Sequence, residues 1–312
     1  MVCYGPVPSR RLGKSLGINN IPFEKVCSYS CIYCQVGLTK YLRYTREPYI
    51  EPEKIYGDVV TLLEKLQPAD YPDYLTFVAN GEPTLDINLG RSISLLKVLG
   101  IPVAVITNAS LLYDKEVRKD ISQADWVSVK VDSAVPAIRK RINRPFPGLT
   151  YDLYCEGLTL FANSYNGVLA TETMLVQGVN DGVDSLDKTA SLIKNLKPQV
   201  SYISVPIRPP AIHSARLPEE EKINTAYQIF TEKGLNSELL VDFEGIDIGY
   251  TGNAKVDILN MCVVHPIREE TMYEILNKDG SDSNIVEQLI SSGQIKKIEY
   301  KGKMFYLRNF SK

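Results

Sequence analysis

The stretch Tyr74-Leu75-Thr76-Phe77-Val78-Ala79 is followed directly by the polar turn Asn80-Gly81-Glu82-Pro83. A short β-rich run that ends in a polar turn is typical of a strand in an α/β sheet. The pattern recurs, and further strands are expected at 16–19, 102–107, 126–131, 169–176 and 202–205. Amphipathic segments of helical length accompany them at 52–66, 89–99, 115–123, 151–163, 185–195 and 219–233. The alternation predicts βα units that build a parallel sheet.

Six strands with their helices, over about 230 residues, are too few for a closed barrel of eight units, which typically takes about 250 residues. We therefore expect an α/β fold in which residues 1–262 form a partial (β/α)6 TIM-like barrel. Two helices are expected at 269–277 and 283–291, then two strands at 295–300 and 304–308, joined by the turn Lys301-Gly302-Lys303. Residues 263–312 thus resemble a small α+β winged-helix module.

The composition excludes several classes of protein. The 312 residues include 35 Lys or Arg and 37 Asp or Glu, so the net charge gives no general attraction to nucleic acid or anionic lipid. No apolar run approaches the roughly 20 residues of a membrane span, and the N-terminus does not resemble a signal peptide. We expect a cytoplasmic protein without a membrane partner. In that compartment the six cysteines are better explained as metal ligands or buried thiols than as disulfides.

Three of the cysteines, Cys27, Cys31 and Cys34, have the spacing CxxxCxxC. Three thiolates within eight residues can face one centre, and thiolates are the ligands of iron–sulfur clusters. A structural zinc ion needs a fourth ligand, and the two histidines, His213 and His265, lie far along the chain. The motif predicts a 4Fe-4S cluster with one iron left open. The alternatives are a zinc ion with a distant fourth ligand, or unliganded thiols.

The CxxxCxxC motif with Tyr33 before its last cysteine resembles the radical S-adenosylmethionine (SAM) superfamily. Residues 6–13, 80–85 and 141–145 are similar to one branch of it, mostly uncharacterised Fe-S oxidoreductases distantly related to the 4-demethylwyosine synthases that modify tRNA. The resemblance covers residues 5–245.

This resemblance implies that the three cysteines hold three irons, while the fourth binds the amino and carboxylate groups of SAM. One electron, from a reductant such as flavodoxin or ferredoxin, then yields methionine and a 5′-deoxyadenosyl radical that abstracts hydrogen from an unidentified substrate. That substrate is an RNA base, a peptide or a small metabolite.

The resemblance also places residues around SAM. Tyr33 is expected beside the adenine. Asn80, Gly81, Glu82 and Pro83 occupy the position of the Gly-Gly-Glu motif that grips the SAM ammonium. Asn replaces the first Gly, and it tolerates left-handed backbone better than most residues. The alternative for this segment is an ordinary turn after a strand.

The ends of the next two strands supply the remaining expected SAM contacts. By position, Thr107, Asn108, Lys130 and Asp132 reach the SAM carboxylate and ribose hydroxyls. The alternatives for Lys130 are a pair with Asp132 or contact with solvent.

No catalytic base is assigned, but six side chains are candidates for substrate binding: Arg10, Arg11, Arg141, Asn143, Arg144 and Asn180. Basic side chains near the cysteines suit a phosphate or carboxylate, or the acidic surface of a reductant. Solvated helix faces and structural arginine pairs are the alternatives. Asn180 and Asp181 are equally suited to capping the helix expected at 185.

The remaining cysteines, Cys3, Cys155 and Cys262, are far apart in the sequence, and they are buried thiols or ligands of a second cluster. The last 20 residues carry six basic side chains and one acidic one. This module therefore suits RNA or peptide binding, or a lid over the active site. A different function for the whole chain is a non-catalytic Fe-S protein that senses redox state or regulates by binding nucleic acid.

Overall fold

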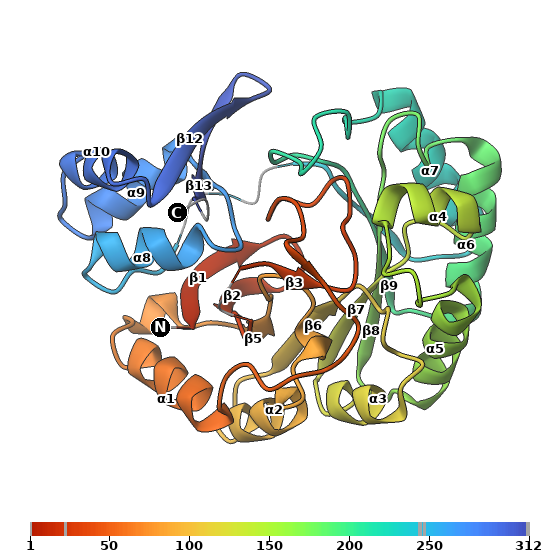
Figure 1. Cartoon of the computed structure of the whole chain (residues 1–312), viewed down its shortest axis with the longest axis horizontal. Coiled ribbons are helices and arrows are strands. Elements are labelled where there is room, and N and C mark those ends of the chain that lie inside the picture. The colour runs from red at the N-terminus through yellow and green to blue at the C-terminus, as the bar shows by residue number, and fades with distance from the viewer. Residues whose placement is uncertain (1, 22–23, 243–244, 246–247, 310–312) are drawn as a thin grey trace.

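The centre of the molecule is one curled sheet of eight strands. The computed structural model describes residues 2–21, 24–242, 245 and 248–309. The strands, in spatial order, are β1 (Cys3–Ser9), β2 (Gly13–Ile18), β5 (Tyr74–Phe77), β6 (Val103–Thr107), β7 (Trp126–Lys130), β8 (Val168–Met174), β9 (Val200–Ser204) and β10 (Ser237–Leu240). β1 pairs antiparallel with β2, and every later pair is parallel (Figure 1).

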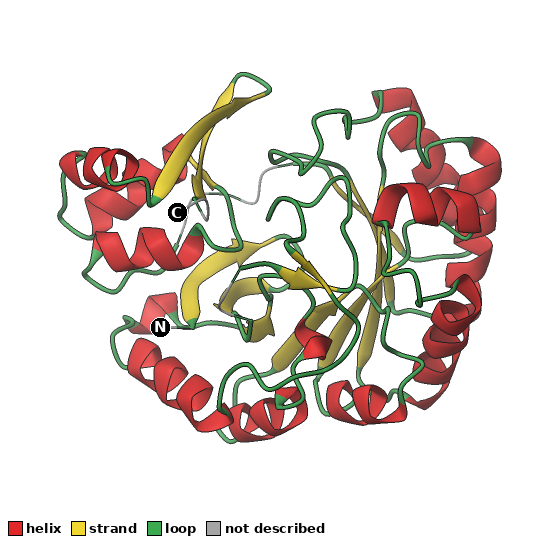
Figure 2. Cartoon of the chain, in the orientation of Figure 1, coloured by secondary structure: helices red, strands yellow, loops and turns green. Residues whose placement is uncertain are grey.

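Helices cover the outer, convex face of this sheet (Figure 2). They are α1 (Pro52–Leu63), α2 (Leu89–Lys97), α3 (Lys115–Ile121), α5 (Tyr151–Ser164), α6 (Val183–Leu196) and α7 (Glu220–Glu232). The helix α4 (Pro136–Asn143) follows β7, and its Ile142 packs with Ile32 and Tyr33 instead. Short 3₁₀ turns lie at Pro68–Asp70 and Pro83–Leu85. The expected partial barrel is confirmed. The structure adds the edge strands β1 and β10 and the helix α4 to the predicted elements.

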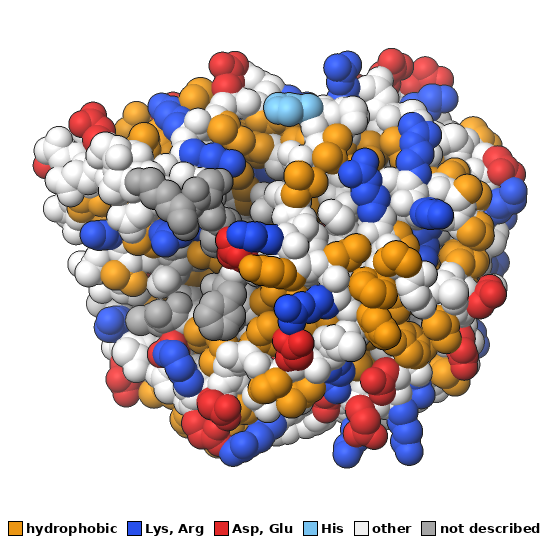
Figure 3. Space-filling model, viewed as in Figure 1, with side chains coloured by type: hydrophobic (Ala, Val, Ile, Leu, Met, Phe, Trp, Pro, Cys, Tyr) orange, Lys and Arg blue, Asp and Glu red, His pale blue; other side chains and the backbone are white. Residues whose placement is uncertain are grey.

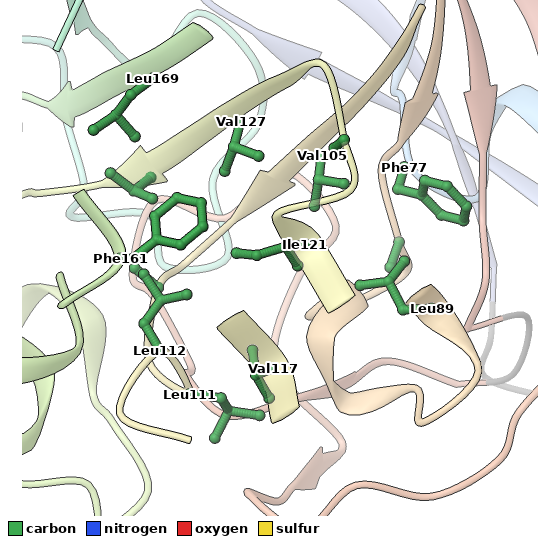
Figure 4. Packing of buried hydrophobic residues seen from close by; sticks show 14 of the residues in the cluster. Phe77, Leu89, Val105, Leu111, Leu112, Val117, Ile121, Val127, Phe161 and Leu169 are labelled. Atoms are coloured by element: carbon green, nitrogen blue, oxygen red, sulfur yellow. The ribbon is translucent and has the colours of Figure 1, made fainter. Parts of the chain in front are cut away.

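The main core lies between the convex face and the helices. Phe77, Val105 and Val127 point from their strands toward α2 and α3, and Phe161 of α5 packs beside them (Figure 4). Because side chains alternate between the two faces of a strand, the neighbouring residues point to the concave face. This concave face carries Lys130 and Glu172 among its residues and is where the site lies.

The C-terminal part forms a second, antiparallel sheet in the order β11 (Ile267–Arg268), β13 (Lys303–Arg308) and β12 (Ile295–Tyr300). The helices α9 (Glu269–Lys278) and α10 (Asn284–Ser291) were predicted, and a third helix, α8 (Ala254–Met261), packs against both of them. Its core continues onto Tyr4 and Val7 of β1. The small module is confirmed. The boundary after residue 262 stays a prediction, and Lys312, counted among the basic residues, lies outside the described residues.

Within the described part of the chain, the helices are too short or too polar to cross a membrane.

Candidate functional site

The cysteine loop, defined here as residues 25–37, lies against the turn that follows β5. The N–H of Val26 donates to the carbonyl oxygen of Asn80 (3.2 Å), and the N–H of Glu82 donates to that of Val26 (3.1 Å). Gly81 lies between them with φ of +141°, and a Cβ there would be 1.6 Å from the Val26 oxygen. Only glycine fits this contact, because its backbone tolerates the conformation and no side chain intervenes.

A second support for the cysteine loop is the C-terminal end of α4. The N–H of Ser30 donates to the carbonyl of Asn143, and the N–H of Ile32 donates to that of Ile142, both at 3.0 Å. These carbonyls belong to the last turn of a helix, where they have no intrahelical partner. The side chains of Arg141 and Arg144 are exposed beside this contact. The segment therefore holds the loop by its backbone.

Each thiol of the motif receives an N–H donor from a side chain. The donors are Asn108 for Cys27 (3.6 Å), Asn143 for Cys31 (3.5 Å) and Lys25 for Cys34 (3.0 Å). Such hydrogen bonds to sulfur are characteristic of Fe-S sites, where they tune the reduction potential. Burial raises the pKa of Cys27 to about 12 and that of Cys31 to about 11, so thiolates at these positions need a cationic partner such as iron.

A single metal ion fits these residues less well than a cluster does. Among the described residues, no three His, Cys, Asp or Glu side chains converge on one ion. Zinc would need four ligands at about 2.0–2.3 Å. His213 is exposed, and His265 lies 3.0 Å from Arg208. In a 4Fe-4S cluster each cysteine binds a different iron, so the thiols need not converge on one point. The donor set therefore fits the cluster.

Glu82 joins the ends of β5 and β6. Its carboxylate is almost fully buried and accepts from the Thr84 N–H (3.2 Å) and hydroxyl (2.7 Å), the Thr107 hydroxyl (2.6 Å) and the Asn108 N–H (2.7 Å). Burial raises the pKa of Glu82, although these bonds oppose the shift. Glu82, Thr107 and Asn108 thus form one unit that shapes the turn, and Pro83 begins the 3₁₀ turn after it.

Asp132 is the second buried carboxylate beside the cysteines. Its Oδ2 accepts from the Tyr33 hydroxyl (2.5 Å) and from the Asn143 amide (2.6 Å), and its Oδ1 accepts from the Met174 N–H (2.8 Å). Asn180 donates to the carbonyls of Asp132 (2.8 Å) and Met174 (2.9 Å). Asn180 is therefore engaged with the backbone of the sheet edge. The alternative that Asn180 or Asp181 caps the next helix is wrong, since the N-cap of α6 is Gly182.

Lys130 pairs with Glu172 rather than with Asp132, at 2.7 Å. The other oxygen of Glu172 binds the Arg11 guanidinium, and the Ser204 hydroxyl donates to it as well (2.8 Å). Burial alone would raise the pKa of Glu172, but Arg11 and Lys130 outweigh it and hold the pKa well below its usual range. Glu172 was not among the predicted site residues. Its signal was a carboxylate within an otherwise uncharged strand.

A cavity of about 230 Å³ lies between the cysteine loop and the concave face. Its walls include apolar side chains from four strand ends, namely Val78, Ile106, Met174 and Val205. Its charged lining comprises Arg10, Arg11, Lys130, Glu172 and Arg208, and Tyr33 and Cys34 border it as well. A smaller cavity of about 110 Å³ adjoins it and shares Arg10, Arg11 and Arg208. Lys and Arg side chains also surround the centre of the face in Figure 3.

The structure does not bring the other three cysteines together. The thiol of Cys3 lies 3.3 Å from the Asp58 carbonyl on α1, and that of Cys262 lies 3.5 Å from the Tyr306 carbonyl in the C-terminal module. Cys155 is on α5, beside Tyr151. These separate surroundings favour three isolated thiols over a second cluster.

The comparisons with known proteins agree with this site. The model of the family "Radical SAM superfamily" matches residues 21–193. A UPF0026 protein of Methanocaldococcus jannaschii is 44% identical over 310 residues, which cover 99% of this chain and 96% of that protein. A UPF0026 protein of Synechocystis is 36% identical over 66% of this chain and 76% of its own. The crystal structure of a radical SAM methyltransferase from Sphaerobacter thermophilus superposes on this chain with a TM-score of 0.55. The match covers 73% of this chain and 66% of that one at 15% sequence identity, so the two proteins are similar in fold.

Proposed function

The chain belongs to the radical SAM superfamily and, within it, to the UPF0026 family, and we propose that it abstracts hydrogen from a substrate bound in the concave cavity. A radical SAM domain implies a 4Fe-4S cluster and SAM as cofactors. When both are bound, one electron splits SAM into methionine and a 5′-deoxyadenosyl radical, which takes a hydrogen atom to become 5′-deoxyadenosine. The protein supplies binding, orientation and exclusion of water.

The cysteine loop is the observation that carries this proposal. Cys27, Cys31 and Cys34 would hold the cluster, and each already receives an N–H donor. Cys34 borders the cavity, so a cluster held by the loop would lie beside it. This arrangement suits chemistry on a bound molecule better than redox sensing, which needs no enclosed cavity.

The SAM contacts follow from the ends of three strands. The backbone of Asn80, Gly81 and Pro83, shaped by Glu82, would bind the SAM ammonium. Tyr33 would border the adenine, and Thr107, Asn108, Lys130 and Asp132 would support the ribose and carboxylate. Lys130 lines the cavity and lies 5.3 Å from the Tyr33 ring centre, which supports a contact with SAM.

Different side chains near the cysteine loop suit contact with a reductant and with the substrate. Arg141 and Arg144 are exposed beside the cysteine loop and suit the acidic surface of a one-electron reductant such as flavodoxin or ferredoxin. Asn143 acts within the site, on Asp132 and Cys31. Arg10 and Arg11 line the cavity and would contact the substrate. The link to 4-demethylwyosine synthases, and an RNA or peptide substrate, stay predictions.

Two contacts of the C-terminal module support a role as a lid over the cavity. Its Tyr300 hydroxyl donates to the carbonyl of Pro206, which lines the cavity, at 3.0 Å. Gln35 of the cysteine loop donates to the Val264 carbonyl (2.9 Å). These contacts support a lid more directly than a nucleic-acid interface.

The test is anaerobic reconstitution with iron and sulfide, followed by dithionite and SAM. We expect about four irons per chain and 5′-deoxyadenosine in the mass spectrum, and Cys31→Ala should lose both. Cleavage that persists in Cys31→Ala would overturn the cluster assignment. Intact SAM beside a full cluster, together with salt-sensitive DNA binding, would favour the regulatory alternative.

A further inference from the structure

Three charged side chains that line the cavity, Arg11, Lys130 and Glu172, are called here its floor, and in this group two cations bind one carboxylate. Glu172 is 2% exposed, and its two oxygens bind Arg11 and Lys130 separately. Ionised, the three side chains carry one net positive charge in a largely buried environment, with side-chain exposures of 16% for Arg11, 18% for Lys130 and 3% for Glu172. Electrostatic interactions are stronger there than in water, so an anion entering the cavity is attracted strongly.

Arg11 also has unused capacity for hydrogen bonding. Its guanidinium donates to Glu172 and lies 5.8 Å from the centre of the Tyr202 ring, which fixes its orientation. Its Nε is buried without an acceptor among the described residues. The planar guanidinium matches the two oxygens of a carboxylate or phosphate, which makes arginine the preferred residue for such groups.

The cysteine loop borders the same cavity close to this group, since the Lys130 ammonium lies 5.3 Å from the centre of the Tyr33 ring, and the rest of the wall is largely apolar. Met174 and Ile106 line this wall, and Tyr33 and Cys34 mark the cluster end. The volume of about 230 Å³ is below the usual range for drug-sized ligands. A ligand with an anionic head and a short apolar body fits this distribution of groups.

We infer that the substrate carries an anionic group, a carboxylate or a phosphate, which Arg11 binds at the floor of the cavity while an apolar part faces the cluster end. This inference rests on the proposed function, because it takes the cavity as the place where the radical meets its substrate. Glu172 fixes Arg11 in place and limits the positive charge that the floor presents.

The test is calorimetric titration of the anaerobically reconstituted protein with inorganic phosphate and, separately, with butyrate. The anion that binds identifies the type of head group. Glu172→Gln should tighten binding severalfold, because the floor gains a positive charge, whereas simple structural damage would weaken it. Adding Arg11→Gln to that variant should then weaken binding at least about tenfold, since a charge-assisted hydrogen bond is lost. This pair leaves no buried carboxylate unpaired. Arg91→Gln, on an exposed arginine, is the matched control and should change nothing.

Three results would overturn the inference: neither anion binds, the Arg11 change has no effect in the Glu172→Gln background, or SAM displaces the anion competitively. The last result would assign the floor to the cofactor carboxylate. The same preparations are assayed for 5′-deoxyadenosine. SAM cleavage without anion binding refutes only this inference, and anion binding without cleavage refutes the proposed function and, with it, the role of the bound anion as a substrate.

Discussion

Replacing Gly81 with alanine should detach the cysteine loop from the sheet. The new Cβ would lie 1.6 Å from the Val26 oxygen, so that oxygen must move by about 1.4 Å to reach the 3.0 Å minimum of real contacts. This shift breaks the two hydrogen bonds between Val26 and the turn, each worth about 0.5–1.5 kcal/mol. The φ of +141° adds strain of about 1–3 kcal/mol for a residue with a side chain. The total loss of stability is therefore about 2–6 kcal/mol.

Urea unfolding measures this loss, and iron per chain after reconstitution reports on the loop. Gly100→Ala is the matched control. Gly100 also has a positive φ (+72°), but its added Cβ would meet no atom within 4 Å, so it should lose only about 1 kcal/mol and keep all its iron. The reasoning is refuted if Gly81→Ala matches the Gly100→Ala control in both stability and iron content.

Three further changes test other parts of the site. In Glu172→Gln, the free energy of unfolding should depend less on pH below about 4.3, the pKa of an unfolded Glu. In that range the unfolded wild-type chain binds a proton that the folded chain does not bind at Glu172, so wild-type stability falls by up to about 1.4 kcal/mol per pH unit as the pH is lowered. Equal pH dependence of the two proteins in urea unfolding would contradict this. Glu82→Gln should retain iron but weaken SAM binding about tenfold, because a neutral amide cannot accept all the donors that the carboxylate holds, and unchanged affinity by calorimetry would remove Glu82 from the site. The triple replacement of Cys3, Cys155 and Cys262 by Ser should leave iron per chain unchanged, and a loss of half the iron would restore the second cluster.

The strands that could be predicted are those with buried, β-branched sequences. β7 (Trp126–Lys130) and β6 (Val103–Thr107) begin and end within one residue of expectation, because both faces of these strands are covered. β1 was missed because Cys3–Ser9 contains Gly and two Pro residues, which are tolerated only at the edge of a sheet. β10 is short and half-exposed, so its sequence lacks the apolar run.

Site residues could be predicted where they lie close together in the sequence, and could not be predicted where only tertiary contacts bring them together. The cysteine motif and the turn after β5 are visible in sequence, since each occupies a few consecutive residues. Lys25 resembles an ordinary surface lysine, and it is buried only because Cys34 and the carbonyl of Gly37 converge on its ammonium (3.0 and 2.5 Å). Glu172 acquires its role from Arg11, 161 residues away in the sequence.

The docking of the cysteine loop also constrains how the enzyme is made. The loop is complete only when residues 80–82, residues 142–144 and Val264 have all reached it. Contacts of such long sequence separation form late in folding, after the chain that carries them has been synthesised. We therefore expect iron to be delivered to a nearly finished protein rather than to a nascent one, and a ribosome stalled before residue 80 would expose three cysteines before any of these partners has been made.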